Sequence, residues 1–439
     1  MKNMKKLIAL LLCILAVASL VACNKAEEYP AEPAKDYSAW AGLVADSTSW
    51  IEAYKNLPVA NEDMTATELR QLCVDVFKAN LSFPWTPNKH ISYTYTLGGS
   101  SSSVMLPAGR AYSGLCYATG VEGATTGNID KILSYYDEKT GVLDVEAMGN
   151  KFMGMITSAC SYGALQGWNR VVNSHNIQAM RFYNQTDGNI VPVGPYTYDT
   201  TTYNANFGSD TATTEIIYAN GYQTMYESLA AMQPADGLYS SPVWHVMMCS
   251  SVPVVERNAD GTINPYNSYL LVCEQDTYGT KGNKDPIAQS DGKLIYPLGT
   301  VDNKYTFDQL IKKGYIPFTF KEFLDQDPIE AGKAWLGNEA APVKSGADMT
   351  ASAIFGKTVG ANYVINNILI EIKDAEGKNL YTYDPSIFTH PSSRSVSLNG
   401  HLPTEKLTPY ANGKNTIHIM VQLANGELID AFNTVLKFD

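Results

Sequence analysis

The sequence lacks any cluster of basic residues. Lys and Arg number 32 against 44 Asp and Glu among 439 residues, which gives a formal net charge of -12 at pH 7. Proteins that bind nucleic acids, or acidic lipid surfaces, through charge carry basic patches. We therefore expect no nucleic acid among the partners of this chain and no polybasic contact with a membrane.

Long apolar runs are also scarce, and the clearest lies near the amino terminus. An apolar run from Leu7 to Val21 follows three lysines, and small residues lead to Cys23. This is the layout of a secretory signal, because the run is too short and wrongly flanked for a stop-transfer helix. Residues 20–23, Leu-Val-Ala-Cys, resemble the lipobox of bacterial lipoproteins. That resemblance implies a signal peptide over residues 1–22 and lipid on Cys23; the alternative is an ordinary signal peptide with an incidental cysteine.

The remaining chain is too long for one core, so we expect two domains. Residues 23–45 begin with a polar stretch that contains two prolines, and this composition predicts a tether. A first domain is expected over residues 46–338, and a boundary where the chain becomes small and polar around residues 337–348. The lipid would attach the protein to the outer face of the cell membrane or to an outer membrane.

Residues 345–439 alternate with period two between short turns, as at Asn412-Gly413 and Asn425-Gly426. Strands are expected over residues 365–372, 416–422 and 428–436. Short strands with frequent turns predict a small β-sandwich of immunoglobulin type. No catalytic cluster is visible in it, so we expect a structural or adhesive role.

Cysteines are few and show no close-spaced framework. Beyond Cys23 the chain has Cys73, Cys116, Cys160, Cys249 and Cys273. An odd number leaves at least one thiol unpaired, and such a thiol is a candidate for chemistry, although anaerobic export would also leave cysteines free.

Several helices and one loop are expected in the first domain. Apolar residues recur at helical spacing from Ser47, and Thr65 with Glu68 forms a capping-box pattern at the start of a second helix. Residues 97–103 are rich in Gly and Ser and are expected to form a loop. The polar stretch at residues 183–209 is expected to form a long loop over a site.

Cys160 lies in a third helical region, residues 150–175. A helix that begins at Ser158 or Ala159 places Cys160 in its first turn, where unpaired N–H groups and the positive end of the helix dipole favour a thiolate. The apolar face of this helix would hold Cys160, Ala164, Gly167, Trp168, Val171 and Val172. A buried core cysteine is the alternative; Cys116 is a weaker candidate nucleophile, because no helix start follows it.

His245 is the candidate base for this thiol. It interrupts the apolar strand at residues 243–249, whereas His90 adjoins a turn, His175 follows a helix end, and His390, His401 and His418 lie in the expected sandwich. A histidine that opens a strand downstream of a helix-capping cysteine suits a Cys/His pair. The alternative is a histidine that is hydrogen-bonded within a half-buried strand.

Glu274 is the candidate third member. If the hairpin folds symmetrically about Asp260-Gly261, paired positions sum to 521, and Glu274 lies on the same face as His245, diagonally opposite. Gln275 would point away, and a one-residue bulge would reverse the assignment.

The order of these pieces resembles the NlpC/P60 branch of the papain-like cysteine peptidases. Cys160-Ser161 resembles the centre of the family's Asp-Cys-Ser-Gly box, residues 232–237 its turn before the histidine strand, and His245-Val246 its His-Val start. Residues 106–114 resemble a segment whose tyrosine lines the site, which implies a role for Tyr112. The resemblance implies an α+β papain-like domain with Cys160, His245 and Glu274 as catalytic residues. It also implies substrate contacts at Tyr112, Ser161 and Tyr162.

Ala159 and Tyr162 depart from the family's box, which has Asp and Gly at these positions. The family's Asp binds the free amino end of a muropeptide, so the usual substrate specificity is in doubt. The 29-residue spacing from His245 to Glu274 also exceeds the family's short hairpin.

The expected function is a surface cysteine amidase or peptidase that acts on peptidoglycan stem peptides or related peptides. It needs no metal or other cofactor, and we expect a monomer. The rival hypothesis is a non-catalytic surface lipoprotein that uses the same cleft to hold a peptide or glycan.

Overall fold

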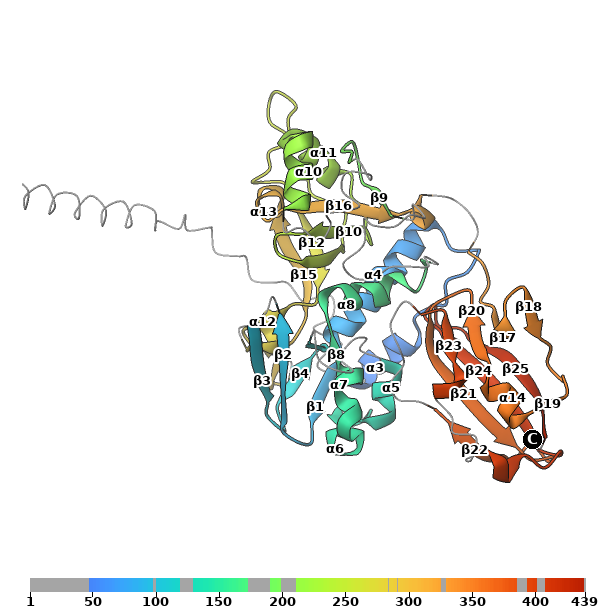
Figure 1. Ribbon diagram of the computed structural model, residues 1–439. Coiled ribbons are helices and arrows are strands. Elements are labelled where there is room, and N and C mark those ends of the chain that lie inside the picture. The colour runs from blue at the N-terminus through green and yellow to red at the C-terminus, as the bar shows by residue number, and fades with distance from the viewer. Residues whose placement is uncertain are drawn as a thin grey trace, which may run out of the picture. The chain divides into compact units, whose positions relative to one another are not determined.

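The computed structural model describes residues 47–97, 100–118, 129–172, 190–198, 211–282, 284–289, 291–324, 329–384, 393–400 and 407–437. Cys23, the expected signal peptide and tether, and most of residues 183–209 lie outside these ranges. Within them the fold is mixed α and β, with several sheets (Figure 1). None of the described helices is long and apolar enough to cross a membrane.

Two helices open the described chain, α3 (Ser47–Lys55) and α4 (Ala66–Ser82). The predicted capping box is confirmed: the Glu68 N–H donates to Thr65 Oγ1 at 3.3 Å, and the Thr65 N–H donates to Glu68 Oε2 at 2.7 Å. The predicted apolar stripe of α4 is buried. Its members are Leu69, Leu72, Cys73, Val76 and Phe77.

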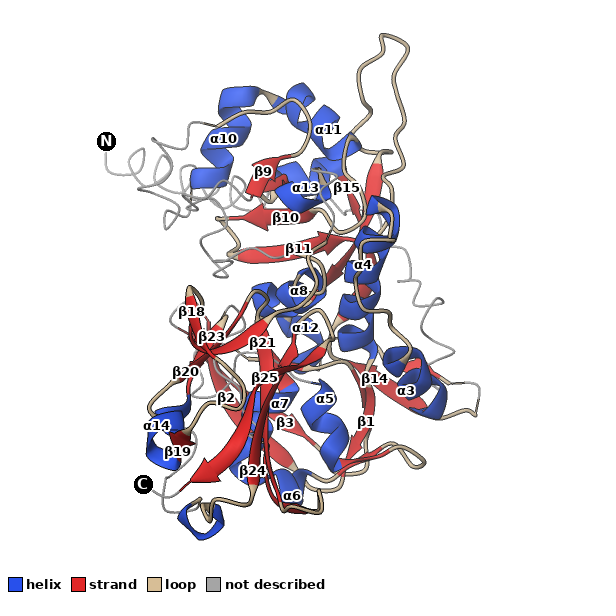
Figure 2. Cartoon of the chain, turned by 90° about the vertical axis from the view of Figure 1, so that its right-hand side faces the viewer, coloured by secondary structure: helices blue, strands red, loops and turns tan. Residues whose placement is uncertain are grey.

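A six-stranded antiparallel sheet forms one half of this region. Its order is β15-β12-β11-β10-β16-β9. The strands are β9 (Ile190–Pro192), β10 (Gly237–Ser240), β11 (His245–Cys249), β12 (Tyr269–Glu274), β15 (Thr300–Thr306) and β16 (Tyr315–Phe320). Helix α8 (Cys160–Trp168) packs on β11 and β12 and against α4, and Figure 2 shows α8 and α4 next to this sheet.

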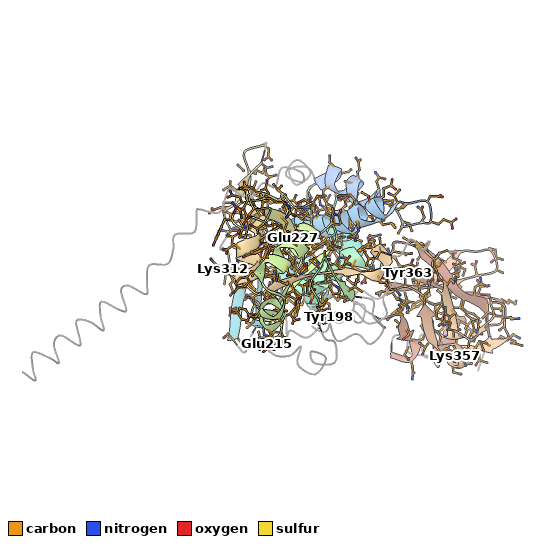
Figure 3. The ribbon with its side chains drawn as sticks, turned by 90° about the horizontal axis from the view of Figure 1, so that it is seen from above. Tyr198, Glu215, Glu227, Lys312, Lys357 and Tyr363 are labelled. Atoms are coloured by element: carbon orange, nitrogen blue, oxygen red, sulfur yellow. The ribbon has the colours of Figure 1, made fainter. Side chains whose placement is uncertain are left out.

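Three helices border the same sheet near β16: α10 (Ala212–Asn220), α11 (Tyr222–Ala230) and α13 (Phe307–Lys312). Figure 3 labels one side chain from each of them, Glu215, Glu227 and Lys312. Their apolar sides join the large core that also contains Trp168, Met248 and Phe318.

A second six-stranded sheet has the order β13-β14-β4-β1-β7-β6. Its strands are β1 (Pro84–Pro87), β4 (Ala111–Ser113), β6 (Tyr136–Asp137), β7 (Val142–Leu143), β13 (Ile287–Ala288) and β14 (Leu294–Pro297). The short helices α5 (Ile129–Ile132), α6 (Val145–Met148), α7 (Phe152–Ile156) and α12 (Thr277–Thr280) accompany it. Its core contains Trp85 and Phe152, and reaches Cys160.

Two local predictions are wrong in this region. Residues 97 and 100–103 do not belong to a loop, because β2 (Ile91–Leu97) and β3 (Ser100–Leu106) pair in full antiparallel register. The helix expected over residues 150–175 is interrupted by β8 (Thr157–Ser158), which pairs in parallel with β5 (Cys116–Tyr117). The chain is therefore extended just before Cys160, where α8 (Cys160–Trp168) begins.

The carboxy-terminal part has two sheets, β18-β17-β20-β23 and β19-β25-β24-β21-β22. Their strands are β17 (Ala334–Asn338), β18 (Ala341–Val343), β19 (Met349–Thr350), β20 (Thr358–Ala361), β21 (Ile365–Lys373), β22 (Asn379–Tyr383), β23 (Ser395–Ser397), β24 (Thr416–Leu423) and β25 (Leu428–Lys437). Residues from both sheets share one hydrophobic cluster, beside the helix α14 (Ala351–Phe355). The three predicted strands match β21, β24 and β25, and residues 337–348 include β18 rather than a linker alone.

Candidate active site

Cys160 is the first residue of α8. Ala159, the residue before it, is extended (φ -92°, ψ 170°) and provides no side-chain cap. The N–H groups of a first helical turn lack acceptors within the helix, and the dipole places partial positive charge there. The Cys160 side chain is 8% exposed, so this field acts on it with little screening by water.

His245 is the first residue of β11 and faces this helix start. Its Nε2 lies 2.9 Å from Oε2 of Glu274, which leaves Nδ1 as the ring nitrogen for Cys160. The Cys160 Sγ lies 3.9 Å from the carbonyl oxygen of Trp244, the preceding residue. Trp244 has φ +50°, an unfavourable backbone conformation for a large side chain, and such strain concentrates at functional sites.

Glu274 ends β12 and is 4% exposed. Its Oε1 accepts hydrogen bonds from Asn303 Nδ2 at 2.6 Å and from the Tyr305 hydroxyl at 3.2 Å. The predicted register is confirmed, since Met248 pairs with Cys273 and Cys249 with Val272. Gln275 points the other way and donates to the Leu115 carbonyl oxygen at 2.8 Å.

The electrostatics of the three groups favour a thiolate and an imidazolium. Burial alone would raise the pKa of Cys160, but the hydrogen bond and positive charge of His245, together with the N–H groups of Val246 and Ser161, bring this pKa below its ordinary value. Burial lowers the pKa of His245, yet Cys160 and Glu274 outweigh it and raise this pKa. Burial opposes ionisation of Glu274, but His245 and Asn303 hold its pKa low.

The other described cysteines behave differently. Burial raises the pKa of each of their thiols, and all five described cysteines are free. These four are Cys73, Cys116, Cys249 and Cys273. Cys160 is thus the described thiol whose surroundings favour the nucleophilic thiolate.

The three predicted substrate-contact residues lie in different surroundings. Tyr112 lies in β4, with its ring packed against Trp85 and Tyr296. Ser161 is buried beside Cys160, and Tyr162 is half-buried against the large core.

Two tyrosines that the sequence did not single out lie near the thiol. The Tyr117 hydroxyl interacts with Cys160, and burial together with this contact raises the Tyr117 pKa. The Tyr315 ring lies edge-on to His245, with centroids 6.4 Å apart. Tyr117 reaches the site because β5 pairs with β8, which runs directly into Cys160, and no sequence motif marks that pairing.

Two of the other five histidines have partners away from Cys160, and the remaining three are not described. His90 Nδ1 accepts from the Ala108 N–H, and His418 pairs with Asp430 on the carboxy-terminal sheet. His175, His390 and His401 lie outside the described residues. Within the described ranges, no three His, Cys, Asp or Glu side chains are grouped as metal ligands.

No protein-family model matches the chain, and no curated protein matches it.

Proposed function

We propose that the protein is a cysteine hydrolase, an amidase or peptidase that acts through Cys160, His245 and Glu274. The observation that carries the proposal is the buried relay in which His245 interacts with a helix-start thiol on one side and a carboxylate on the other. A nucleophile, a base and a group that orients the base are the parts that acyl transfer through a thiol requires.

The chemistry follows from this arrangement. The Cys160 thiolate attacks an amide carbonyl carbon, and the developing oxyanion lies near the N–H groups that open α8. The Tyr117 hydroxyl is a further donor beside the Cys160 sulfur. The tetrahedral intermediate expels the amine, which takes the proton of His245, and a thioester forms. Water then attacks the thioester while His245 accepts its proton, and the acid product and the thiol are released.

The substrate class and fold family come from the resemblance to NlpC/P60 peptidases. Cysteine on a helix start, histidine at the start of a strand and an acid on the next strand support a papain-like domain. Peptide stems of peptidoglycan are the proposed substrate. The carboxy-terminal domain of the protein is proposed to be of immunoglobulin type. A lipid on Cys23 is proposed to hold the protein, as a monomer, at the outer face of a cell membrane or outer membrane.

Thiol reactivity and product analysis test the proposal together. Iodoacetamide near neutral pH should alkylate Cys160 well before the other four described thiols, as measured by peptide mass spectrometry, and His245→Ala should slow the alkylation of Cys160. The protein should release soluble peptides from isolated peptidoglycan, whereas Cys160→Ala should not. Equal alkylation of all thiols would rule out the catalytic proposal. Binding of peptidoglycan without release of any product would support the rival function of a binding lipoprotein.

A further inference from the structure

The strand next to Glu274 is irregular at the active site. Strand β15 pairs Asn303 with Val272 but Thr300 with Glu274, so that β15 carries one more residue than β12 between these two pairs. This extra residue is a β-bulge, a feature that re-aims side chains next to functional sites. Asp302, within the bulge, has φ +53°.

The bulge is held from two sides. Asp302 Oδ2 lies 2.7 Å from Lys78 Nζ of α4, and its Oδ1 accepts from the Ser250 hydroxyl at 2.6 Å. Both side chains of the Lys78–Asp302 ion pair are about nine-tenths buried, at 11% and 12% exposed. The distorted strand is therefore tied to α4, the helix against which α8 packs.

We propose that Asn303, which follows the bulge in regular register with Val272 and therefore lies on the face of Glu274, is a positioning residue for the Cys160–His245 pair. Asn303 is 4% exposed, and its amide donates to Oε1 of Glu274 while Oε2 faces His245. With both oxygens engaged, the carboxylate has one orientation, and this orientation fixes the imidazole plane. The inference rests on the proposed thiol chemistry.

The neighbouring titratable groups determine in which direction the pKa of Cys160 shifts when Asn303 is replaced. The titratable groups that face Glu274 are His245, Tyr305, Tyr315 and Lys284, whose ammonium is paired with Asp276 at 2.9 Å. Those that face Cys160 are His245, Tyr117 and Tyr315. Loss of the Asn303 donor leaves Oε1 of Glu274 with the longer hydrogen bond from Tyr305, so that the carboxylate is less tightly oriented toward Nε2 of His245. The hydrogen bond that holds the His245 proton then weakens, and Cys160 returns toward the ordinary thiol pKa.

The test is a pH titration of the Cys160 thiolate in the full chain, followed by ultraviolet absorbance with Cys160→Ser as the blank. Asn303→Leu keeps roughly the size of the side chain but has no donor, and Asn303→Ala removes the amide. We expect both variants to raise the midpoint of the titration by about one pH unit. The matched control is Asn367→Ala, which also removes a buried amide that donates to a carboxylate, that of Asp384 at 2.8 Å.

The outcomes separate the two proposals. Folded Asn303 variants with the wild-type midpoint would overturn the positioning role and leave the proposed function intact. A wild-type Cys160 that titrates in the ordinary thiol range would overturn both. An equal shift in Asn367→Ala would show that the change reflects general loosening, and would also overturn the positioning role.

Discussion

At the scale of single residues, the charge of Glu274 stabilises the protonated form of His245. Glu274→Gln keeps the shape of the side chain but removes the charge that stabilises the imidazolium. Hydrogen bonds to charged groups contribute about 1.5–3 kcal/mol, so we expect alkylation of Cys160 at neutral pH to slow by roughly 10- to 100-fold. The measurement is the second-order rate constant with iodoacetamide.

The control for this substitution is Glu227→Gln on α11. Glu227, labelled in Figure 3, also forms a carboxylate ion pair, with Arg257 at 2.7 Å, but its side chain is 34% exposed and that of Arg257 is 48% exposed. Its loss should leave the alkylation rate unchanged. A Glu274→Gln protein that reacts as fast as wild type would mean that the carboxylate does not assist His245.

The choice of Glu274 over Gln275 was predictable because side chains alternate along a strand. Folding about Asp260-Gly261 fixes which residues share a face, and the two pairs between β11 and β12 obey the predicted sum. The bridges nearer the turn, Val254 with Tyr269 and Arg257 with Ile263, depart from it, so the hairpin is symmetric at the strands and not in the connection. Tyr117 was not predictable in this way. Its position depends on a parallel pairing between segments 41 residues apart, which no local pattern encodes.

At the scale of elements, the approach of α8 to α4 depends on Gly167. A Cβ at this position would lie 2.5 Å from the Cys73 carbonyl oxygen and 2.9 Å from Met248 Cε. Gly→Ala inside a helix ordinarily stabilises by about 1 kcal/mol. Here the close contact with the Cys73 carbonyl oxygen makes the substitution destabilising instead. We expect Gly167→Ala to lower the free energy of unfolding by about 1–3 kcal/mol, measured by urea denaturation.

Gly356→Ala is the matched comparison, at the end of α14. Its new Cβ would meet nothing closer than the Ser352 carbonyl oxygen at 3.4 Å, so its stability should change little. If the two substitutions have the same effect, close packing between α4 and α8 is not the cause. If Gly167→Ala lowers both the rate of Cys160 alkylation and the free energy of unfolding, the packing of α8 on α4 also holds Cys160 in place.

The elements that were predicted well have local signals. The start of α4 is marked by its own capping residues, and β24 and β25 meet at an Asn-Gly turn in which Gly426 has φ +102°. Strand β3 was mistaken for a loop because its serines give no apolar alternation. Only pairing with β2 shows that Val104 and Leu106 lie on a buried face.

At the scale of the whole molecule, ionisation of the buried relay should make stability depend on pH. The raised pKa of His245 means that its contribution is complete below the ordinary value of 6.5, and is lost as the pH rises through the raised pKa. The lowered pKa of Glu274 means that its contribution is complete above the ordinary value of 4.5, and is lost as the pH falls through the lowered pKa. Cys160, with its lowered pKa, contributes fully only above 9.0.

The free energy of unfolding should therefore differ most between wild type and Glu274→Gln from pH 4.5 to 6.5, where the contributions of Glu274 and His245 are both complete. The difference should shrink in more acidic solution as Glu274 takes up a proton, and in alkaline solution as His245 loses its own. Urea denaturation at a series of pH values measures it, with Glu227→Gln in parallel. A difference that is independent of pH would mean that Glu274 stabilises the fold by packing and neutral hydrogen bonds rather than by its charge.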